Sequence, residues 1–176
     1  MVGTGRKKGT GVEMKGVDLL ASIINLEGNL KFELCFLRND MFDYRPERSN
    51  FENWVPFILC LNLPNRYTII GESSKAIMTI FEVDKLINGV KSVLSHVKTR
   101  KNGIYMFNSS EGYFELKLET IPVDNVIEFE LWINVGIQTK GEIYGYDEGV
   151  RFVTGTNALN RFITDLQKNY IDVMNF

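Results

Sequence analysis

Residues 113–135 read YFELKLETIPVDNVIEFELWINV, and this stretch decides the predicted fold. Apolar and polar residues alternate in both halves, which is typical of β-strands with one buried face. The segment Ile121-Pro122-Val123-Asp124 predicts a turn between them, because proline cannot donate to a strand ladder and aspartate favours turns. We therefore expect an antiparallel hairpin. Its expected buried side holds Phe114, Leu116, Leu118, Ile127, Phe129, Leu131, Ile133 and Val135, and its expected solvent side holds Tyr113, Glu115, Lys117, Glu119, Val126, Glu128, Glu130, Trp132 and Asn134.

Trp132 is the unusual member of the solvent side, because it stands among glutamates. A large apolar side chain gains nothing from facing water, so this position indicates a binding surface. The alternative is that a helix covers Trp132 and makes it part of the core.

The composition suits one globular domain with an ordinary core: 176 residues, 44% hydrophobic and 24% charged. The formal net charge of −2 gives no global reason to expect nucleic-acid or membrane binding. The charge is nevertheless uneven. Residues 85–101 hold five Lys or Arg and no acid, whereas residues 111–148 hold nine acids and two lysines. Such asymmetry indicates either solvated faces or an electrostatically steered partner.

Two features of the sequence favour a cytoplasmic protein. No apolar run approaches the roughly 18 residues of a membrane-spanning helix, and the N-terminus MVGTGRKKGTG lacks the apolar segment of a signal peptide. Cys35 and Cys60 are then expected to be reduced thiols, and without a CxxC pair they predict neither a metal site nor a disulfide framework.

The N-terminal residues 1–16 are expected to form a flexible tail, followed by a single α+β domain over residues 17–176. The tail combines five of the fifteen glycines with four basic residues, and so it offers little apolar surface to offset the entropy of ordering. Its glycines match neither the dinucleotide-binding nor the Walker spacing, which argues against a phosphate-binding loop.

The first half of the domain predicts mostly strands. Residues 20–26 and 29–37 form an expected hairpin around Glu27-Gly28, with a short helix over residues 17–24 as the alternative to the first strand. A long polar loop over residues 38–53 precedes WVPFILCLNL, residues 54–63, which is apolar enough for a strand covered on both faces. Strands over residues 66–71 and 76–81 follow.

Two helices are expected. Apolar residues change to helical spacing from Val83, and a second helical stripe begins near Leu159, where Thr156 is a natural N-cap. Between them lie a strand over residues 103–108, the central hairpin, a loop over residues 136–141, and two short strands, residues 142–147 and 150–154, around Asp147-Glu148-Gly149. The count is about eight strands and two amphipathic helices, which predicts an α+β fold with both helices packed on a mainly antiparallel sheet.

Catalytic signals are weak. The single histidine, His96, lies off the apolar stripe of its expected helix and lacks the local company that is usual for a catalytic or metal-binding histidine. What remains for an enzyme is the carboxylates Glu115, Glu119, Glu128 and Glu130, which could bind a divalent metal or hydrolyse a glycoside. Glu115-Leu116-Lys117 also matches the ExK step of metal-dependent nucleases, but alternating charged strands produce this tripeptide by chance.

The same side of the hairpin is equally suited to recognition. Tyrosine and tryptophan contribute much of the energy of protein interfaces, and an acidic rim steers basic partners. The candidate partner-binding residues are Trp132, Glu128, Glu130, Tyr113, Glu115, Glu119, Tyr144 and Tyr146.

The order of these elements resembles the WapI-type immunity proteins of polymorphic and contact-dependent toxin systems in bacteria. The resemblance covers residues 29–176. It rests on Glu52-Asn53-Trp54-Val55, which leads into the buried strand, and on three short motifs. These are FEVDKL at residues 81–86, where a helix begins, SEGYFEL at residues 110–116, where a strand begins, and TNAL at residues 156–159, where the last helix begins.

The resemblance implies a role and names no site: a cytoplasmic protein that neutralises a cognate toxin. We therefore expect a non-enzymatic immunity protein that binds a basic toxin domain through an acidic, aromatic face, with no cofactor, no metal and no direct contact with nucleic acid or membrane. A carboxylate- and metal-dependent hydrolase, either a nuclease or a glycosidase, is the alternative.

Overall fold

The computed structural model describes residues 20–71, 75–139, 145 and 147–175. The expected tail, residues 1–16, lies outside this part of the chain, as do Tyr144 and Tyr146. Within the described residues the chain forms nine strands, two α-helices and one 3₁₀ helix, η1 (Val135–Thr139), which confirms the predicted α+β class. Neither described helix is long and apolar enough to cross a membrane.

The strands form two antiparallel sheets rather than the one that we expected. The first sheet has the order β1-β2-β3-β4, with β5 pairing the start of β3. Its strands are β1 (Ala21–Ile24), β2 (Lys31–Phe36), β3 (Trp54–Leu63), β4 (Arg66–Ile70) and β5 (Ile77–Thr79). The second sheet has the order β6-β7-β8-β9 and contains β6 (Ile104–Asn108), β7 (Phe114–Ile121), β8 (Val126–Asn134) and β9 (Asp147–Gly155).

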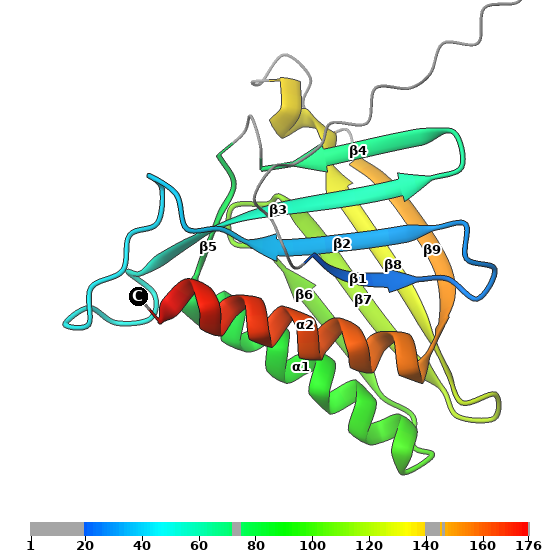
Figure 1. The fold of residues 1–176 in the computed structure, drawn as a ribbon. Coiled ribbons are helices and arrows are strands. Elements are labelled where there is room, and N and C mark those ends of the chain that lie inside the picture. Colours follow the sequence, from blue (N-terminus) through cyan, green and yellow to red (C-terminus); the bar gives the residue numbers. More distant parts are fainter. Residues whose placement is uncertain (1–19, 72–74, 140–144, 146, 176) are drawn as a thin grey trace, which may run out of the picture.

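The two sheets face each other, and helices α1 (Ile80–Lys98) and α2 (Thr156–Met174) run side by side along the open side between them (Figure 1). Aromatic rings fill the interior. Phe32 of the first sheet lies 5.3 Å from Phe129 of the second and 5.8 Å from Phe162 of α2, measured between ring centroids. One apolar core therefore joins both sheets and both helices.

Helix α2 packs mainly on β1 and β2, whereas α1 packs on β6 and β7. The apolar stripe of α2, made of Leu159, Phe162, Ile163 and Leu166, is buried as predicted. It faces the first sheet, and the ring of Phe32 lies between Phe162 and Phe129 of the central hairpin. Both helices lie on the inner side of the second sheet. Neither of the two described α-helices therefore covers the outer side of that sheet.

Several predicted boundaries were close to the observed ones. The first hairpin is confirmed as β1 and β2, and a helix over residues 17–24 is excluded because Ala21–Ile24 is a strand. Helix α1 begins at Ile80, three residues before the expected start. The reason is a capping box, in which the Thr79 side chain accepts from the Glu82 N–H and the Glu82 carboxylate accepts from the Thr79 N–H.

Two predictions near the C-terminus were wrong. Asp147-Glu148-Gly149 is not a turn between two short strands but part of β9, because β9 pairs with β8 along its whole length, from Asn134↔Asp147 to Val126↔Gly155. Thr156 is not the N-cap of α2 but its first residue. Its hydroxyl donates to the backbone oxygen of Asn125 at 3.0 Å, and Gly155 is the N-cap.

Candidate protein-binding face

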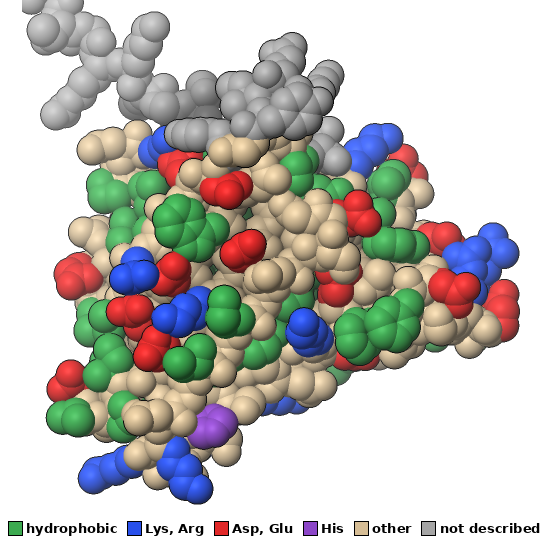
Figure 2. Space-filling view, turned by 180° about the vertical axis from the view of Figure 1, so that it is seen from behind, with side chains coloured by type: hydrophobic (Ala, Val, Ile, Leu, Met, Phe, Trp, Pro, Cys, Tyr) green, Lys and Arg blue, Asp and Glu red, His purple; other side chains and the backbone are tan. Residues whose placement is uncertain are grey.

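The side of the second sheet that faces away from the first sheet is called the outer face here. Strand pairing arranges its residues in rows. Trp132 stands between Glu115 and Gly149, Glu130 stands between Lys117 and Arg151, and Glu128 stands beside Glu119. Figure 2, seen from behind the view of Figure 1, shows acidic, basic and apolar side chains interspersed on this face.

Trp132 is 44% exposed, so the alternative that a helix covers it is excluded. Its indole is nevertheless held in place. The Nε1–H donates to Glu130 Oε1 at 2.7 Å, and the ring lies across Gly149, where a Cβ atom would come within 2.4 Å of Trp132 Cε3. The missing side chain at Gly149 therefore creates the space that the indole occupies. An aromatic ring held in this way loses little conformational entropy when a partner binds to it.

The acids of the outer face are partly paired with bases. Arg151 donates from Nη2 to Glu130 Oε2 at 2.6 Å and lies 3.6 Å from Glu128, while Lys117 lies 2.7 Å from Glu119. The hydrogen bond from Trp132, and then those from Arg151, lower the pKa of Glu130 below its ordinary value. Glu130 is therefore ionised at neutral pH. Exposed pairs of this kind add little to stability, and their main effect is to orient the side chains.

The outer face remains acidic after this pairing. Its described strand residues carry five acids against two bases, a net charge of −3: Glu115, Glu119, Glu128, Glu130 and Asp147 against Lys117 and Arg151. Glu115 and Asp147 have no partner among the described residues. Both border a cavity of about 190 Å³ beside Trp132 and Asn134.

Tyr113 does not join Trp132, although strict alternation predicts that it should. It precedes β7, and its ring packs edge-on against Phe57 of β3, with 5.6 Å between centroids. Burial, together with the nearby charge of Glu111, raises the pKa of its hydroxyl. Alternation fails here because the ladder pattern ends at Phe114, so nothing forces the ring of Tyr113 outward. The positions of Tyr144 and Tyr146 stay untested, because both lie outside the described residues.

Sequence reasoning missed three contributors to the outer face. Arg151 and Gly149 escaped notice because we expected the strand to be broken at Gly149, and the alternation of residues 147–155 could have revealed both. The third is the edge strand β6, where Ile104 is 62% and Met106 is 61% exposed. They extend the apolar part of the face beyond Trp132.

The four carboxylates that could have served a hydrolase do not converge. Glu115, Glu119, Glu128 and Glu130 are spread over three rows of the sheet, and only Glu115 borders the 190 Å³ cavity. That volume is below the roughly 300–1,000 Å³ of ordinary ligand pockets. Among the described residues, no three His, Cys, Asp or Glu side chains are grouped to hold a metal ion.

The other reactive side chains lie apart from this face. His96 Nδ1 is 2.8 Å from the Ser92 backbone oxygen of the preceding turn of α1. Cys35 and Cys60 are buried free thiols, and burial raises the pKa of Cys35 to about 11, which makes it a poor nucleophile at neutral pH.

Comparisons with known proteins agree with the resemblance seen in the sequence. The model of the Immunity protein WapI-like family matches residues 22–171, which includes both sheets and nearly all of α2. No match was found among curated proteins or among solved structures. Because the match spans most of the chain, this protein belongs to the WapI-like family of immunity proteins.

Proposed function

We propose that this protein is a non-enzymatic immunity protein that neutralises a cognate toxin by binding it through the outer face of the β6–β9 sheet. Trp132 is the central contact, with Glu115 and Glu130 beside it and with Glu119 and Glu128 further along the same two strands. Membership of the family supports the immunity role. The exposed, held indole of Trp132 is the observation that supports this particular face.

Physical chemistry favours Trp132 as an anchor for two reasons. Tryptophan is enriched among the interface residues whose truncation costs most, and such residues lie near the middle of a contact area. The indole also needs no reorganisation before binding, because Gly149 and Glu130 already hold it. Ile104 and Met106 would add apolar area toward one edge of the same contact.

The charge of the face favours a basic toxin surface. A net charge of −3 over four strands attracts a positive partner and raises the association rate. Glu115 and Asp147, which have no partner among the described residues, are free to pair with Lys or Arg of the toxin.

The same geometry supports binding over hydrolysis. A hydrolase needs carboxylates that meet at one substrate, whereas these are spread over a broad sheet surface. The lowered pKa of Glu130 also makes it unsuitable as a general acid at neutral pH.

Replacement of Trp132 by alanine tests the proposal. Trp132→Ala should weaken toxin binding by about 2 kcal/mol or more, which is roughly 30-fold in Kd, because it removes the anchor. The free energy of unfolding should fall by only about 1 kcal/mol, since the side chain is partly exposed. Isothermal titration against the cognate toxin domain and denaturant unfolding measure the two effects. Unchanged affinity would overturn the proposed face.

A charge reversal separates steering from contact. Glu128→Lys should slow association and make the rate less sensitive to salt, because it reduces the negative field of the face. Asp172→Lys is the matched control, since it changes the net charge by the same amount and Asp172 is exposed on α2, away from the face. Equal effects of the two reversals would show that the charge of the outer face has no special part in association.

A further inference from the structure

A second surface feature lies at the far end of the β7–β8 hairpin from Trp132. Here a groove of about 690 Å³ separates the C-terminal end of α1 from the hairpin turn. Val97, Lys98 and Arg100 line it on one side, and Pro122, Val123 and Asn125 line it on the other. Trp132 lies about 20 Å away along β8. The groove is therefore separate from the outer face and from the function proposed for it.

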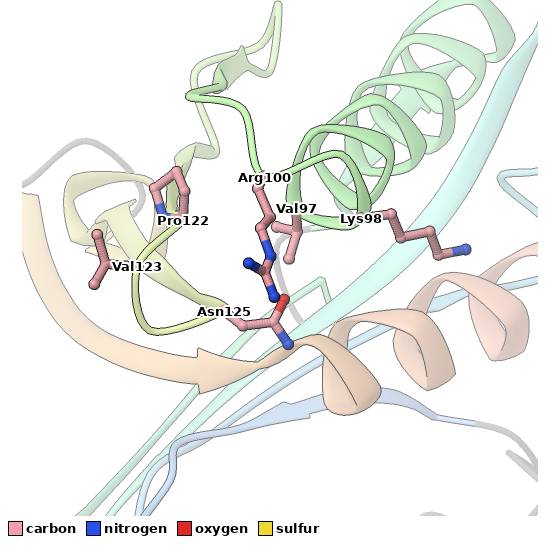
Figure 3. A pocket seen from close by; sticks show the side chains of 6 residues that line it. All are labelled: Val97, Lys98, Arg100, Pro122, Val123 and Asn125. Carbon is pink, nitrogen blue, oxygen red and sulfur yellow. The ribbon is translucent and has the colours of Figure 1, made fainter.

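The size and lining of the groove suit a small molecule. Its volume is within the roughly 300–1,000 Å³ that is typical of ligand sites. Figure 3 shows the side chains of Arg100 and Asn125 extending toward each other from opposite walls. Pro122 adds apolar surface, and Val123 is 94% exposed at the rim. The Arg100 guanidinium and the Asn125 amide thus lie on opposite walls of a groove that is partly apolar.

The cations of the groove lack the partners that those of the outer face have. Lys98 and Arg100 form no ion pair with any described residue, whereas Lys117 and Arg151 are both in salt bridges. None of the described residues that line the groove is acidic, and the nearest acid in sequence is Asp124 in the hairpin turn. Lys101 follows Arg100 and adds to the positive charge. Cations without an acidic partner among the described residues attract an anion, and the negative end of the α1 dipole offsets only part of their charge.

The backbone conformation of Arg100 is a second, independent indication that this groove binds a ligand. Helix α1 ends in a Schellman motif, with Arg100 N–H donating to Val97 O at 3.0 Å and Lys101 N–H donating to His96 O at 2.9 Å. Arg100 occupies the left-handed position of this motif, with φ +52°, where glycine is the usual residue. The arginine therefore has a conformational cost that a glycine would avoid. A binding role for its guanidinium accounts for that cost.

We propose that this groove binds a small molecule through an oxyanion, either a phosphate or a carboxylate. The Arg100 guanidinium presents paired N–H donors that match the oxygens of such a group. The Lys98 side chain extends away from Asn125 (Figure 3), so its ammonium adds positive charge only at longer range. The Asn125 amide donates from the opposite wall. The apolar body of the ligand contacts Pro122 and Val123.

Titrations of the full chain with three probes test this proposal: inorganic phosphate, AMP and succinate, followed by ¹H–¹⁵N NMR at about 0.15 M salt. At least one probe should give saturable shifts at Arg100 and Asn125 with a Kd below about 10 mM. A response to phosphate and AMP assigns a phosphate site, and a response to succinate alone assigns a carboxylate site. If no probe saturates in this range, the proposal fails.

Matched variants connect the binding to these residues. Arg100→Gln should raise the Kd by about tenfold, and Lys98→Gln should raise it less, since the Lys98 ammonium extends away from Asn125. Lys91→Gln should leave it unchanged, since Lys91 stands two turns earlier on the same side of α1, outside the groove. A loss with Lys91→Gln as large as that with Arg100→Gln would mean nonspecific attraction to the helix and would overturn the proposal.

Arg100→Gly distinguishes a binding role from a structural one. Glycine removes the guanidinium and fits the left-handed backbone, so this variant should lose binding and show a higher Tm than the wild type. Retained binding would show that Arg100 does not hold the anion. A lower Tm would show that Arg100 stabilises the fold, and its left-handed backbone would then no longer support a binding role.

Discussion

The inner and outer faces of the β6–β9 sheet belong to the same strands but carry opposite kinds of residue. On β8 the inner residues Phe129 and Leu131 are fully buried, whereas Glu130 and Trp132, one position away from each, reach solvent. Inner residues pack against other rings, such as Phe129 on Phe152 with 4.6 Å between centroids. Outer residues contact mostly their neighbours on the sheet. The inner face therefore carries the stability, and the outer face is free to carry recognition.

This division makes the two functions of the sheet separable by mutation. Substitutions on the inner side should change the free energy of unfolding. Substitutions on the outer side should change affinity for the toxin and leave folding nearly intact.

Phe162→Ala should give the largest loss of stability, about 3–5 kcal/mol. The ring is fully buried and packs on Phe32, which in turn contacts Phe129 on the inner face. Removing it leaves a cavity between α2 and both sheets. Denaturant unfolding measures the loss, with the partly exposed Trp132→Ala as the comparison. If the two losses were similar, the distinction between the faces would not hold.

Glu82 provides a buried carboxylate to compare with the exposed ones of the outer face. It accepts from the backbone N–H of Ser110 at 2.6 Å and from that of Thr79 at 2.9 Å, and so it ties α1 to the β6–β7 turn. Glu82→Gln should cost about 1–3 kcal/mol at pH 7, because a neutral amide replaces the charged acceptor of these bonds. Chemical unfolding of both proteins gives the difference.

The pH dependence of this difference follows from the pKa of Glu82. Burial alone would raise that pKa, but the hydrogen bonds from Ser110 and Thr79 outweigh burial and hold it below the ordinary value of 4.5. Because the folded state has the lower pKa, the stabilisation is complete above pH 4.5 and is lost as the pH falls through the folded value. The difference between wild type and Glu82→Gln should therefore shrink below about pH 4.5. A constant difference across this range would show that the charge of Glu82 contributes nothing.

Gly149→Ala should affect binding more than folding. The new Cβ would stand 2.4 Å from the Trp132 ring, so the indole must move while the β9 backbone stays paired. We expect an affinity loss of about 1 kcal/mol, smaller than for Trp132→Ala because the ring is displaced and not removed. Gly155→Ala serves as the control, since its Cβ would meet only Leu26 at 3.8 Å. Equal binding by wild type and Gly149→Ala would show that the position of the indole is unimportant.

Deletion of residues 1–16 should have the smallest effect. These residues lie outside the described part of the chain, and the prediction rests on their glycine-rich, basic composition. Tm and toxin affinity of the shortened protein should equal those of the full chain. A clear fall in either would give the tail a role in folding or binding.

Local pattern was sufficient to predict most of the candidate site. Period-two alternation placed Glu115, Glu119, Glu128, Glu130 and Trp132 on one side of β7 and β8, as observed. The same rule failed at Tyr113, because alternation holds only while the residue belongs to a ladder. It also missed Arg151, whose contact with Glu130 depends on the pairing of β8 with β9, strands that are 12 residues apart in the chain.

The sequence by itself determined the α+β class, the central hairpin and the two faces of that hairpin. These follow from residue periodicity and turn chemistry, which are local properties of the chain. Only the tertiary structure decided that the strands divide into two sheets and that α2 packs on the first of them. It also decided that Gly149 lies beneath Trp132 and that Arg100 faces Asn125 across a groove. Each of these depends on contacts between distant segments, and such contacts are set by the packing of the whole core and not by any one stretch of sequence.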